Sequence, residues 1–539
     1  MKYLLYTLVL FGSSCFSQTL PRILEVSFRK DTFNILAYGA KPDGVILNTS
    51  AISRAIKECN LAGGGTVIIP QGLWLTGPII LMNNVNLHIA KGALLQFSNN
   101  TNDYSLVTTN WEGLMAIRCQ SPIYGEDLEN IAITGNGILD GAGEVWRPVK
   151  QSKLTISEWN NLVKSGGILN EQKDTWYPSE SALNGSKAKR PGVIAEGYDL
   201  KSAEKVKDFL RPNMVSLIRC TRILLEGVTF QNSPAWCLHP LLSQHLTLRN
   251  LTVRNPWNAQ NGDGVDIESC RYVLVEHCTF DVGDDGICIK SGRDEEGRKR
   301  NVPTEDVIIR NCTVFHGHGG FVIGSEMSGG ARNIFVSDCN FLGTDVGLRF
   351  KTTRGRGGVV ENIYVDRIRM TNIGGVAILF DMYYQAKDPL AKLTDTEVPV
   401  IEFQPVTETT PQFKNFFIKD VVCKGAATGI FIQGLPEMNI QDIHLEDITI
   451  QSNSGLVCKD AKGITLRHVA LHTKEKHVID LQDSKNITFE NLTFNPSDVL
   501  MKINGSRSKD IRLVDTNTSS VIKVSELGSG VSANVLLKK

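Results

Sequence analysis

Three carboxylates, one imidazole and two basic side chains recur at matching offsets from glycine residues in the middle of the chain. They are Asp263, Asp284, Asp285, His318, Arg349 and Lys351. Two carboxylates roughly 5 Å apart cannot both ionise without cost, so one can act as an acid while the other acts as a base. Cleavage of a glycosidic bond needs such a pair. A nearby guanidinium and ammonium suit a substrate with carboxylates of its own, such as a uronic acid polymer.

The repeat that would bring these side chains together is a glycine followed by an alternating strand. It occurs at Gly264–Glu268, Gly286–Lys290, Gly320–Gly324 and Gly347–Lys351, with intervals of 22, 34 and 27 residues between the glycines. Weaker copies follow at Gly375–Ile378 and Gly429–Ile432. Such intervals are typical of solenoids, in which equivalent residues stack about 4.8 Å apart. We therefore expect Asp263 to stack over Asp285, and Asp284 to lie towards His318.

The same repeat predicts an all-β fold, a right-handed parallel β-helix. A second strand precedes most of the units, and in these strands Cys278, Cys312 and Cys339 hold one register. A leucine-rich repeat would carry a Leu-x-x-Leu-x-Leu signature, which is missing here. A β-propeller needs four strands in about 40 residues or more, and these intervals are too short for that.

Two segments depart from the repeat. Residues 51–59 predict an amphipathic helix, which would cap the open end of the solenoid near the N-terminus. Residues 144–212 form an insertion with two predicted helices, at 156–164 and 200–209. A loop of this length is usually functional, although it could also be a packing flap. We therefore expect a single domain over residues 18–539, with the insertion flanking a cleft.

Composition and the N-terminal segment restrict the partners and the location. The formal net charge of +0 argues against a nucleic-acid partner. Residues 1–17 have the build of a signal peptide rather than a membrane span, which predicts export to the periplasm or the medium, and Cys15 leaves lipoprotein attachment as an alternative. Beyond Cys15 there are eleven cysteines, and we expect most of them to be free thiols in the core.

Four ordered segments resemble the signature segments of the polygalacturonases, the pectin-cleaving glycoside hydrolases of family 28. They are Asn261-Gly262-Asp263, Asp284-Asp285, Gly317-His318-Gly319 and Arg349-Phe350-Lys351. The resemblance covers the chain from about residue 33 to the C-terminal turns and implies the same fold, a pectin-lyase-like solenoid. It also implies that Asp284 is the general acid and that Asp263 and Asp285 hold the attacking water.

The resemblance implies further roles around these carboxylates. His318 would support the acid, and Arg349 and Lys351 would bind a substrate carboxylate, with Asn261 as a further substrate contact. The family also uses a tyrosine some thirty residues after the Arg-x-Lys segment, for which Tyr383 and Tyr384 are candidates and Tyr384 is favoured. Gly262 replaces the usual threonine, and we expect this to alter subsite contacts more than catalysis.

The mode of cleavage follows from the same resemblance. The family inverts the configuration of the sugar, and inversion requires acid and base carboxyls about 6.5 to 9.5 Å apart, so the side chains are expected to diverge. The insertion resembles the extra loops by which exo-acting members close one end of the cleft. The function expected is thus an exported exo-acting α-galacturonidase that acts on pectic polysaccharides or oligosaccharides.

Three alternatives stay open. Rhamnogalacturonan would present the same galacturonic acid to a hydrolase. A β-helical pectate lyase shares the fold but typically needs calcium, and neither a calcium loop nor a zinc site is evident around His316, His318 or residues 281–286, so we predict no metal and no cofactor. A non-catalytic carbohydrate-binding β-helix would need no acid and base. His239 either lines the cleft or has a structural role.

Overall fold

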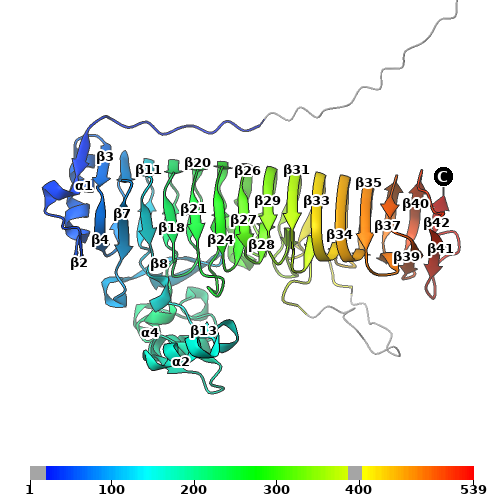
Figure 1. Ribbon diagram of the computed structural model, residues 1–539, viewed down its shortest axis with the longest axis horizontal. Helices are drawn as coiled ribbons and strands as arrows, with labels where there is room; N and C mark the ends of the chain where they lie inside the picture. The colour runs from blue at the N-terminus through cyan, green and yellow to red at the C-terminus, as the bar shows by residue number, and fades with distance from the viewer. Residues whose placement is uncertain (1–19, 387–402, 539) are drawn as a thin grey trace, which may run out of the picture.

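The protein is a long parallel β-helix, seen side-on in Figure 1. The computed structural model describes residues 20–386 and 403–538. The predicted signal segment 1–17 and Cys15 lie outside these residues. Within them, 37 strands join in one continuous sheet system with parallel pairing. Parallel strands joined by crossovers wind right-handed, so the predicted fold class is confirmed.

Three faces run along the solenoid, each built from strands of successive coils. The first face carries the candidate site and consists of β5 (Ile79–Ile80), β10 (Ile123–Glu126), β16 (Val215–Ile218), β19 (Leu238–Leu241), β22 (Val265–Glu268), β25 (Asp285–Lys290), β28 (Gly319–Ile323), β30 (Leu348–Lys351), β32 (Val376–Asp381) and, beyond the site, parts of β33 (Gln412–Gln433) and β34 (Ile440–Lys459), then β36 (His477–Gln482), β39 (Ser497–Asn504) and β41 (Val521–Leu527).

The other two faces complete each coil. The second consists of β1 (Thr32–Asn34), β3 (Gly65–Ile69), β6 (Val85–Ile89), β11 (Glu129–Gly135), β17 (Thr221–Glu226), β20 (Gln244–Arg249), β23 (Arg271–Glu276), β26 (Thr304–Arg310), β29 (Ala331–Leu342), β31 (Val359–Thr371), β33, β34, β35 (Ala461–Thr473), β37 (Lys485–Glu490), β40 (Lys509–Val514) and β42 (Leu536–Lys538). The third begins with β2 (Asp43–Leu47), β4 (Gly72–Thr76), β7 (Ala93–Phe97), β12 (Ile138–Asp140), β18 (Thr229–Gln231), β21 (Thr252–Arg254), β24 (Thr279–Val282) and β27 (Thr313–His316), continues in β29, β31, β33, β34 and β35, and ends with β38 (Thr493–Phe494).

The glycine repeat sets the register of the first face. The residues that follow the four glycines pair from coil to coil in the order Val265, Ile287, Phe321 and Leu348. The glycines therefore form one row, as the repeat predicts. The copy predicted at Gly375–Ile378 is out of register by two residues. Leu348 pairs with Ile378, so the residue that continues the glycine row is Ala377 and not Gly375. Gly374 and Gly375 instead belong to the corner that precedes β32.

One hydrophobic core runs the length of the solenoid, from Ile35 to Val535. Side chains alternate between this core and the outside along each strand, which is the period of two that the sequence showed. The eleven cysteines of the described chain are all free and buried, as expected. No helix among the described residues is long and apolar enough to cross a membrane.

The helix α1 (Thr49–Leu61) covers the N-terminal end of the solenoid, as predicted (Figure 1). It buries Ala51, Ile52, Ala55, Ile56 and Cys59 on one face. A helix at this position shields the terminal coil, whose backbone would otherwise be open to pairing with another chain. The capping function expected of residues 51–59 is therefore consistent with the structure.

The insertion lies between β12 and β16 and projects from one side of the solenoid (Figure 1). It contains α2 (Ile156–Lys164), α3 (Glu180–Lys187), α4 (Leu200–Glu204) and a small antiparallel sheet of β13 (Val149–Lys150), β15 (Thr175–Tyr177) and β14 (Ile168–Leu169). The helix predicted at 156–164 is confirmed. The one predicted at 200–209 is wrong in part, because the chain leaves helical geometry at Val206 and continues as a 3-10 turn, Lys207–Phe209.

A β-hairpin that the repeat did not predict lies between β7 and β10 in the sequence and packs against the insertion. Its strands are β8 (Leu106–Trp111) and β9 (Leu114–Cys119), and the turn between them is Glu112-Gly113. Ile117 donates a backbone hydrogen bond to Gly192 of the insertion. At the tip, Gly113 has a φ of 79°, and a side chain there would lie 2.6 Å from the backbone nitrogen of Arg293. The glycine thus permits the hairpin tip to rest against the coil that carries the site.

Candidate active site

A pocket on the first face collects most of the residues singled out from the sequence. Asn261, Asp263, Asp284, Asp285, Lys351 and Tyr384 line it, together with Glu112, Trp236, Lys290, Arg293, Ser325, Glu326 and Gln385. His318 and Arg349 lie beside it and contact Asp284 and Asp285. The strands β22, β25, β28 and β30 place these groups on neighbouring coils. The stacking predicted from the glycine repeat therefore brings the candidate residues together.

Asp285 is a buried carboxylate held by two cations. Its Oδ2 accepts a hydrogen bond from Lys351 Nζ at 2.7 Å, and its Oδ1 accepts one from Arg349 Nη1 at 3.0 Å. Burial raises the pKa of Asp285, but Lys351, Arg349 and Lys290 outweigh it and hold the pKa well below its usual range. Asp285 is therefore ionised at neutral pH. The Nε of Arg349 is buried and has no hydrogen-bond partner, whereas its side chain as a whole is 16% exposed.

Asp263, one coil away, has the opposite electrostatic environment. It is only 3% exposed, and its Oδ1 has no hydrogen-bond partner. Burial, followed by the carboxylates of Asp266 and Asp284, raises its pKa well above the usual value. Neighbouring carboxyls whose environments push their pKa values apart are the arrangement expected of an acid–base site.

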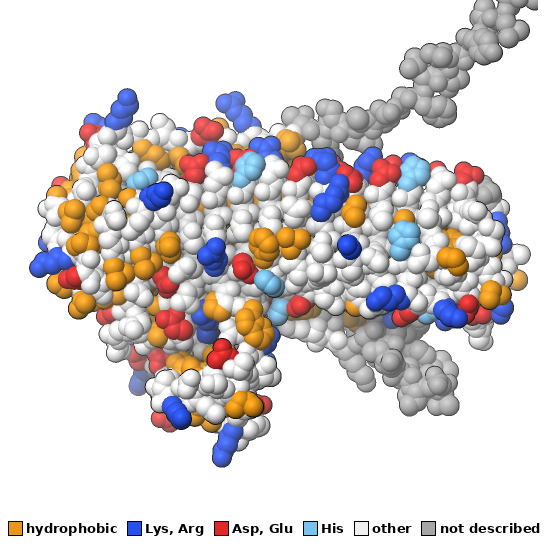
Figure 2. All heavy atoms as spheres, viewed as in Figure 1, with side chains coloured by type: hydrophobic (Ala, Val, Ile, Leu, Met, Phe, Trp, Pro, Cys, Tyr) orange, Lys and Arg blue, Asp and Glu red, His pale blue; other side chains and the backbone are white. Residues whose placement is uncertain are grey.

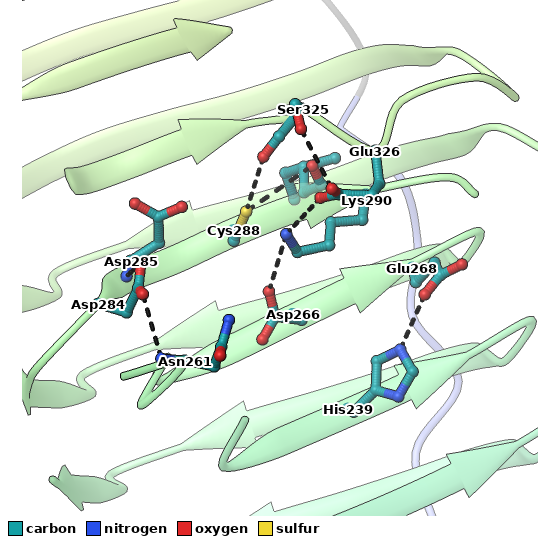
Figure 3. Close-up of polar contacts among 12 residues, drawn as sticks. His239, Asn261, Asp266, Glu268, Asp284, Asp285, Cys288, Lys290, Ser325 and Glu326 are labelled. Carbon is teal, nitrogen blue, oxygen red and sulfur yellow. Dashed lines mark hydrogen bonds and ion pairs between the residues drawn. The ribbon is translucent and has the colours of Figure 1, made fainter. Parts of the chain in front are cut away.

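Asp284 is the most accessible of the three carboxyls, with 21% of its side chain exposed. Its Oδ1 accepts a hydrogen bond from the backbone of Asp285 at 3.0 Å, and its Oδ2 accepts one from the backbone of Asn261 at 3.3 Å (Figure 3). His318 Nδ1 lies 3.3 Å from the same Oδ1. The hydrogen bond with Asp284 raises the pKa of His318 above its usual value. The predicted contact between Asp284 and His318 is thus present.

The carboxyl spacing differs from the expectation. One oxygen from each of Asp263, Asp284 and Asp285 lies within 4.8 Å of the other two. Between these oxygens the distance is shorter than the 6.5 to 9.5 Å expected for the acid and base carboxyls of an inverting enzyme. The reason is the backbone, because Gly264 donates a hydrogen bond to the carbonyl of Asp285 at 2.9 Å and fixes the two rungs side by side. Three such oxygens could also hold a cation, but Lys351 and Arg349 already occupy both oxygens of Asp285.

Tyr384 lines the pocket, and its ring lies 4.8 Å from Lys351 Nζ and 5.8 Å from the guanidinium carbon of Arg349. Tyr383 is instead buried and packs against Arg354. The structure thus places the favoured tyrosine at the site. At Gly262, an added Cβ would lie 2.7 Å from that of Ala259, so this loop leaves no room for a larger side chain.

A charged layer lies next to the pocket, and the sequence predicted it only in part (Figure 3). Lys290 Nζ lies 2.9 Å from Glu326 and 3.6 Å from Asp266, and it packs over the ring of Trp236 at 4.6 Å. Asp266 is fully buried, and neither of its oxygens has a hydrogen-bond partner. Asp266 and Lys290 stand at outward positions of the repeated strands, two and four residues after their glycines, and this position could have identified them from the sequence.

Other pocket residues had no such signal. Glu112, Trp236, Arg293 and Glu326 come from corners and from the hairpin, outside the repeated strands. His239 does not line the pocket. It is 1% exposed and bonds to Asn213 at 3.0 Å and to Glu268 at 2.9 Å, which favours the structural role (Figure 3).

Comparisons with known proteins agree with the geometry. The family model "Glycosyl hydrolases family 28" matches residues 195–434. The exo-poly-alpha-D-galacturonosidase of Dickeya chrysanthemi is 27% identical, over 85% of this chain and 71% of that protein. A hyperthermoactive exopolygalacturonase from Thermotoga maritima is 31% identical, with 88% of this chain and 94% of that one covered and a TM-score of 0.65. A family 28 exopolygalacturonase from Yersinia enterocolitica, at 22% identity, has the same fold, with 85% of this chain and 78% of that one covered and a TM-score of 0.66.

Proposed function

The chain belongs to glycosyl hydrolase family 28, the polygalacturonase family, and on this basis we propose that it removes galacturonic acid from the ends of pectic chains by hydrolysis of α-glycosidic bonds. The observation that carries this proposal is the accessible carboxyl of Asp284 beside two buried carboxyls of opposite pKa shift. The two cations at the same site suit a substrate whose rings are carboxylates.

We propose a role for each carboxyl. Asp284 donates its proton to the leaving glycosidic oxygen, since it is the most exposed of the three. A water molecule with hydrogen bonds of about 2.8 Å can bridge two oxygens less than about 5 Å apart, so Asp263 and Asp285 can hold one between them. The water oxygen bonds to the anomeric carbon as the glycosidic bond breaks, and the ionised Asp285 takes up its proton. We propose that this step inverts the anomeric configuration, which NMR of the first product formed would test.

His318 and Arg349 support these steps in the proposal. His318 contacts Asp284 from the outer side and keeps its carboxyl oriented. The guanidinium of Arg349, whose side chain is 16% exposed, binds a substrate carboxylate near the scissile bond, and Tyr384 lies next to the same cation. Lys351 contacts Asp285 and is buried, so we expect it to act chiefly through that carboxylate.

Exo action is supported by what stands beside the pocket. The hairpin contributes Glu112 to the pocket. Arg211, at the end of the insertion, lies behind the pocket wall and donates a hydrogen bond of 3.0 Å to Oδ1 of the lining residue Asn261. These segments stand on the side of the earlier coils, whereas Tyr384 and Gln385 lie on the side of the later ones. A chain end enters such a site more readily than the middle of a polymer. Relatives named as exo-acting support the same choice.

Product analysis tests the proposal. Wild type, Asp284→Asn and a matched control, Asp281→Asn, would be incubated with oligogalacturonides and with rhamnogalacturonan oligomers, with and without chelator. Asp281 is an exposed aspartate on the same coil that does not line the pocket. We expect saturated monogalacturonate from wild type and control, unaffected by chelator, and at least a 10²-fold loss in Asp284→Asn.

Other outcomes would redirect the proposal. An unsaturated product that chelator abolishes would indicate a lyase, with the three carboxylates as cation ligands. Products from rhamnogalacturonan alone would show that the substrate is rhamnogalacturonan rather than a chain of galacturonic acid only. Binding of oligomers without cleavage under any condition would contradict a hydrolase that acts on these substrates.

We also propose that residues 1–17 direct export and are then removed. The segment has a lysine, an apolar run and small residues in the order of a signal peptide. N-terminal sequencing of the mature protein tests this. A lipid-modified Cys15 at the new N-terminus would support the lipoprotein alternative instead.

A further inference from the structure

A second cavity adjoins the catalytic pocket, and most of the polar side chains that line it are arginines. Arg118, Arg190, Arg211 and Arg293 line it, with Glu112 as the only acidic residue among the lining side chains. Glu112, Asn261 and Arg293 line both spaces, so the two are direct neighbours. We call this space the arginine cavity. The hairpin, the insertion and the coil after β25 each contribute part of its wall.

Two of these arginines are buried charges without an acidic partner. Arg118 is 3% exposed and Arg211 is 6% exposed, and neither forms an ion pair with any described residue. Arg118 donates hydrogen bonds of 3.0 and 2.7 Å to the carbonyl of Arg211 and stacks 3.7 Å over the ring of Trp111. Arg211 donates to the carbonyls of Pro234 and Gln260. Arg211 also donates to the side-chain oxygen of Asn261 at 3.0 Å. Buried charges in proteins are normally paired with opposite charges, and here neutral oxygens are the partners instead.

The electrostatic environment strengthens the case for a bound anion. Burial, followed by the nearby charge of Arg211, lowers the pKa of Arg118 to about 9. Burial lowers the pKa of Arg211 to about 10. Both cations would therefore gain from a negative charge placed between them and the pocket. A planar guanidinium matches the geometry of a carboxylate, which it often binds through two parallel hydrogen bonds.

The remaining arginines leave the cavity positive. Arg293 pairs with Glu112 at 2.9 Å, yet its Nε is buried and has no hydrogen-bond partner. Arg190 comes from the insertion and contacts Glu196 at 3.5 Å and Asp294 at 3.9 Å. The one acidic lining group is thus already engaged by Arg293, at the junction of the two spaces.

We propose that the arginine cavity is a second carboxylate subsite, which binds the terminal uronate ring of the substrate. This inference rests on the proposed function, in which the scissile bond joins the terminal ring to the next ring. The carboxylate of the terminal ring would lie in the arginine cavity, and that of the next ring would lie in the pocket. Arg349 would then bind one uronate ring and the arginine cavity the other. The enzyme would consequently reject chains that end in a neutral sugar.

The test uses digalacturonate and its two analogues in which one ring or the other carries a primary alcohol in place of the carboxylate. For wild type, kcat/KM should fall at least 10²-fold for each analogue, since a site built around charge loses its partner. In Arg118→Gln, the penalty for one of the two analogues should shrink to less than 10-fold. In Arg349→Gln, the penalty for the other analogue should shrink. Arg190→Gln should act as Arg118→Gln does, to a smaller extent.

Controls separate a binding role from a structural one. Arg219→Gln removes an exposed arginine that pairs with Glu126 and Asp127 away from both spaces, and should leave both penalties unchanged. Thermal unfolding checks each variant, and if Arg118→Gln does not fold, the more exposed Arg190→Gln carries the test. Equal losses on all three substrates in Arg118→Gln and Arg190→Gln would overturn the subsite. Failure of wild type to cleave digalacturonate and longer oligomers would instead overturn the proposed function.

Discussion

At the scale of single residues, the site depends on shifting the pKa values of aspartates of one row in opposite directions. Asp285 has a cation on each oxygen, whereas Asp263 is buried with an unpartnered oxygen. The sequence predicted that these residues stack, because their distance from the row of glycines is the same. It could not predict their environments. Lys351 lies two coils beyond Asp285, and the buried Lys290 contacts Trp236 and Glu326, which stand outside the repeated strands.

The state of Asp263 leads to a prediction about stability. Its pKa is raised in the folded protein, so the folded state keeps a proton that the unfolded chain loses above about pH 4. Stability is then lost as pH rises from about 4 towards the folded pKa. Asp263→Asn removes this penalty and should stabilise the protein at pH 7 by about 0.5 to 2 kcal/mol, while activity falls at least 10²-fold. Thermal unfolding between pH 4 and pH 8 measures this.

The pH dependence distinguishes this cause from a general packing effect. The gain in Asp263→Asn should shrink as the pH falls to about 4 and below, because Asp263 then becomes protonated in the unfolded chain as well. The matched variant Asp285→Asn removes a carboxylate whose pKa is lowered, and it should destabilise at pH 7. A gain in Asp263→Asn that is independent of pH would contradict the electrostatic explanation.

At the scale of elements, repeated strands were predictable and the segments between them were not. β22, β25, β28 and β30 follow a period of two and share a glycine row, so their pairing could be predicted from the sequence. The β8–β9 hairpin and α3 lie outside the repeat. The helix α3 packs Gly185 against Phe209, with room for no side chain, and a glycine in a short helix hides the helical pattern. The predicted site therefore lacked Glu112 and the arginine cavity.

The hairpin tip gives a prediction at this scale. In Gly113→Ala, the new methyl group would meet the backbone of Arg293 at 2.6 Å, so the tip must move away from the pocket. Glu112 lies in that turn and pairs with Arg293. We expect kcat/KM to fall by about 10- to 10²-fold, since small displacements of positioning groups cost that much.

Gly197→Ala is the matched control for this substitution. Gly197 has a φ of 88°, close to the 79° of Gly113, but nothing lies within 4 Å of an added Cβ. Both variants should lose about 1 kcal/mol of stability from the left-handed backbone. Only Gly113→Ala should lose activity, and an equal loss in both variants would show that the hairpin tip does not position the site.

At the scale of the whole molecule, a solenoid separates stability from function. The core repeats along the axis, and free buried thiols fill part of it without cross-links. Over the face shown in Figure 2, acidic and basic side chains are intermixed, in keeping with the net charge of +0. The charges of the candidate site and of the arginine cavity are concentrated at one place, where four coils, the hairpin and the insertion meet. The fold was predictable because each coil repeats the same pattern, whereas this meeting point occurs once and leaves no period in the sequence.

This one-sided construction predicts how the enzyme degrades a polymer. The hairpin lines the pocket from the side of the earlier coils, and the insertion packs against the hairpin there. Polygalacturonate should therefore lose monomers from its ends, so that its viscosity falls slowly while reducing sugar accumulates. A sample cut at random by mild acid to the same number of reducing ends should show a much lower viscosity. Equal viscosities at equal bond cleavage would mean that polymer passes through the site, and the insertion would then serve binding along the chain rather than closure of its end.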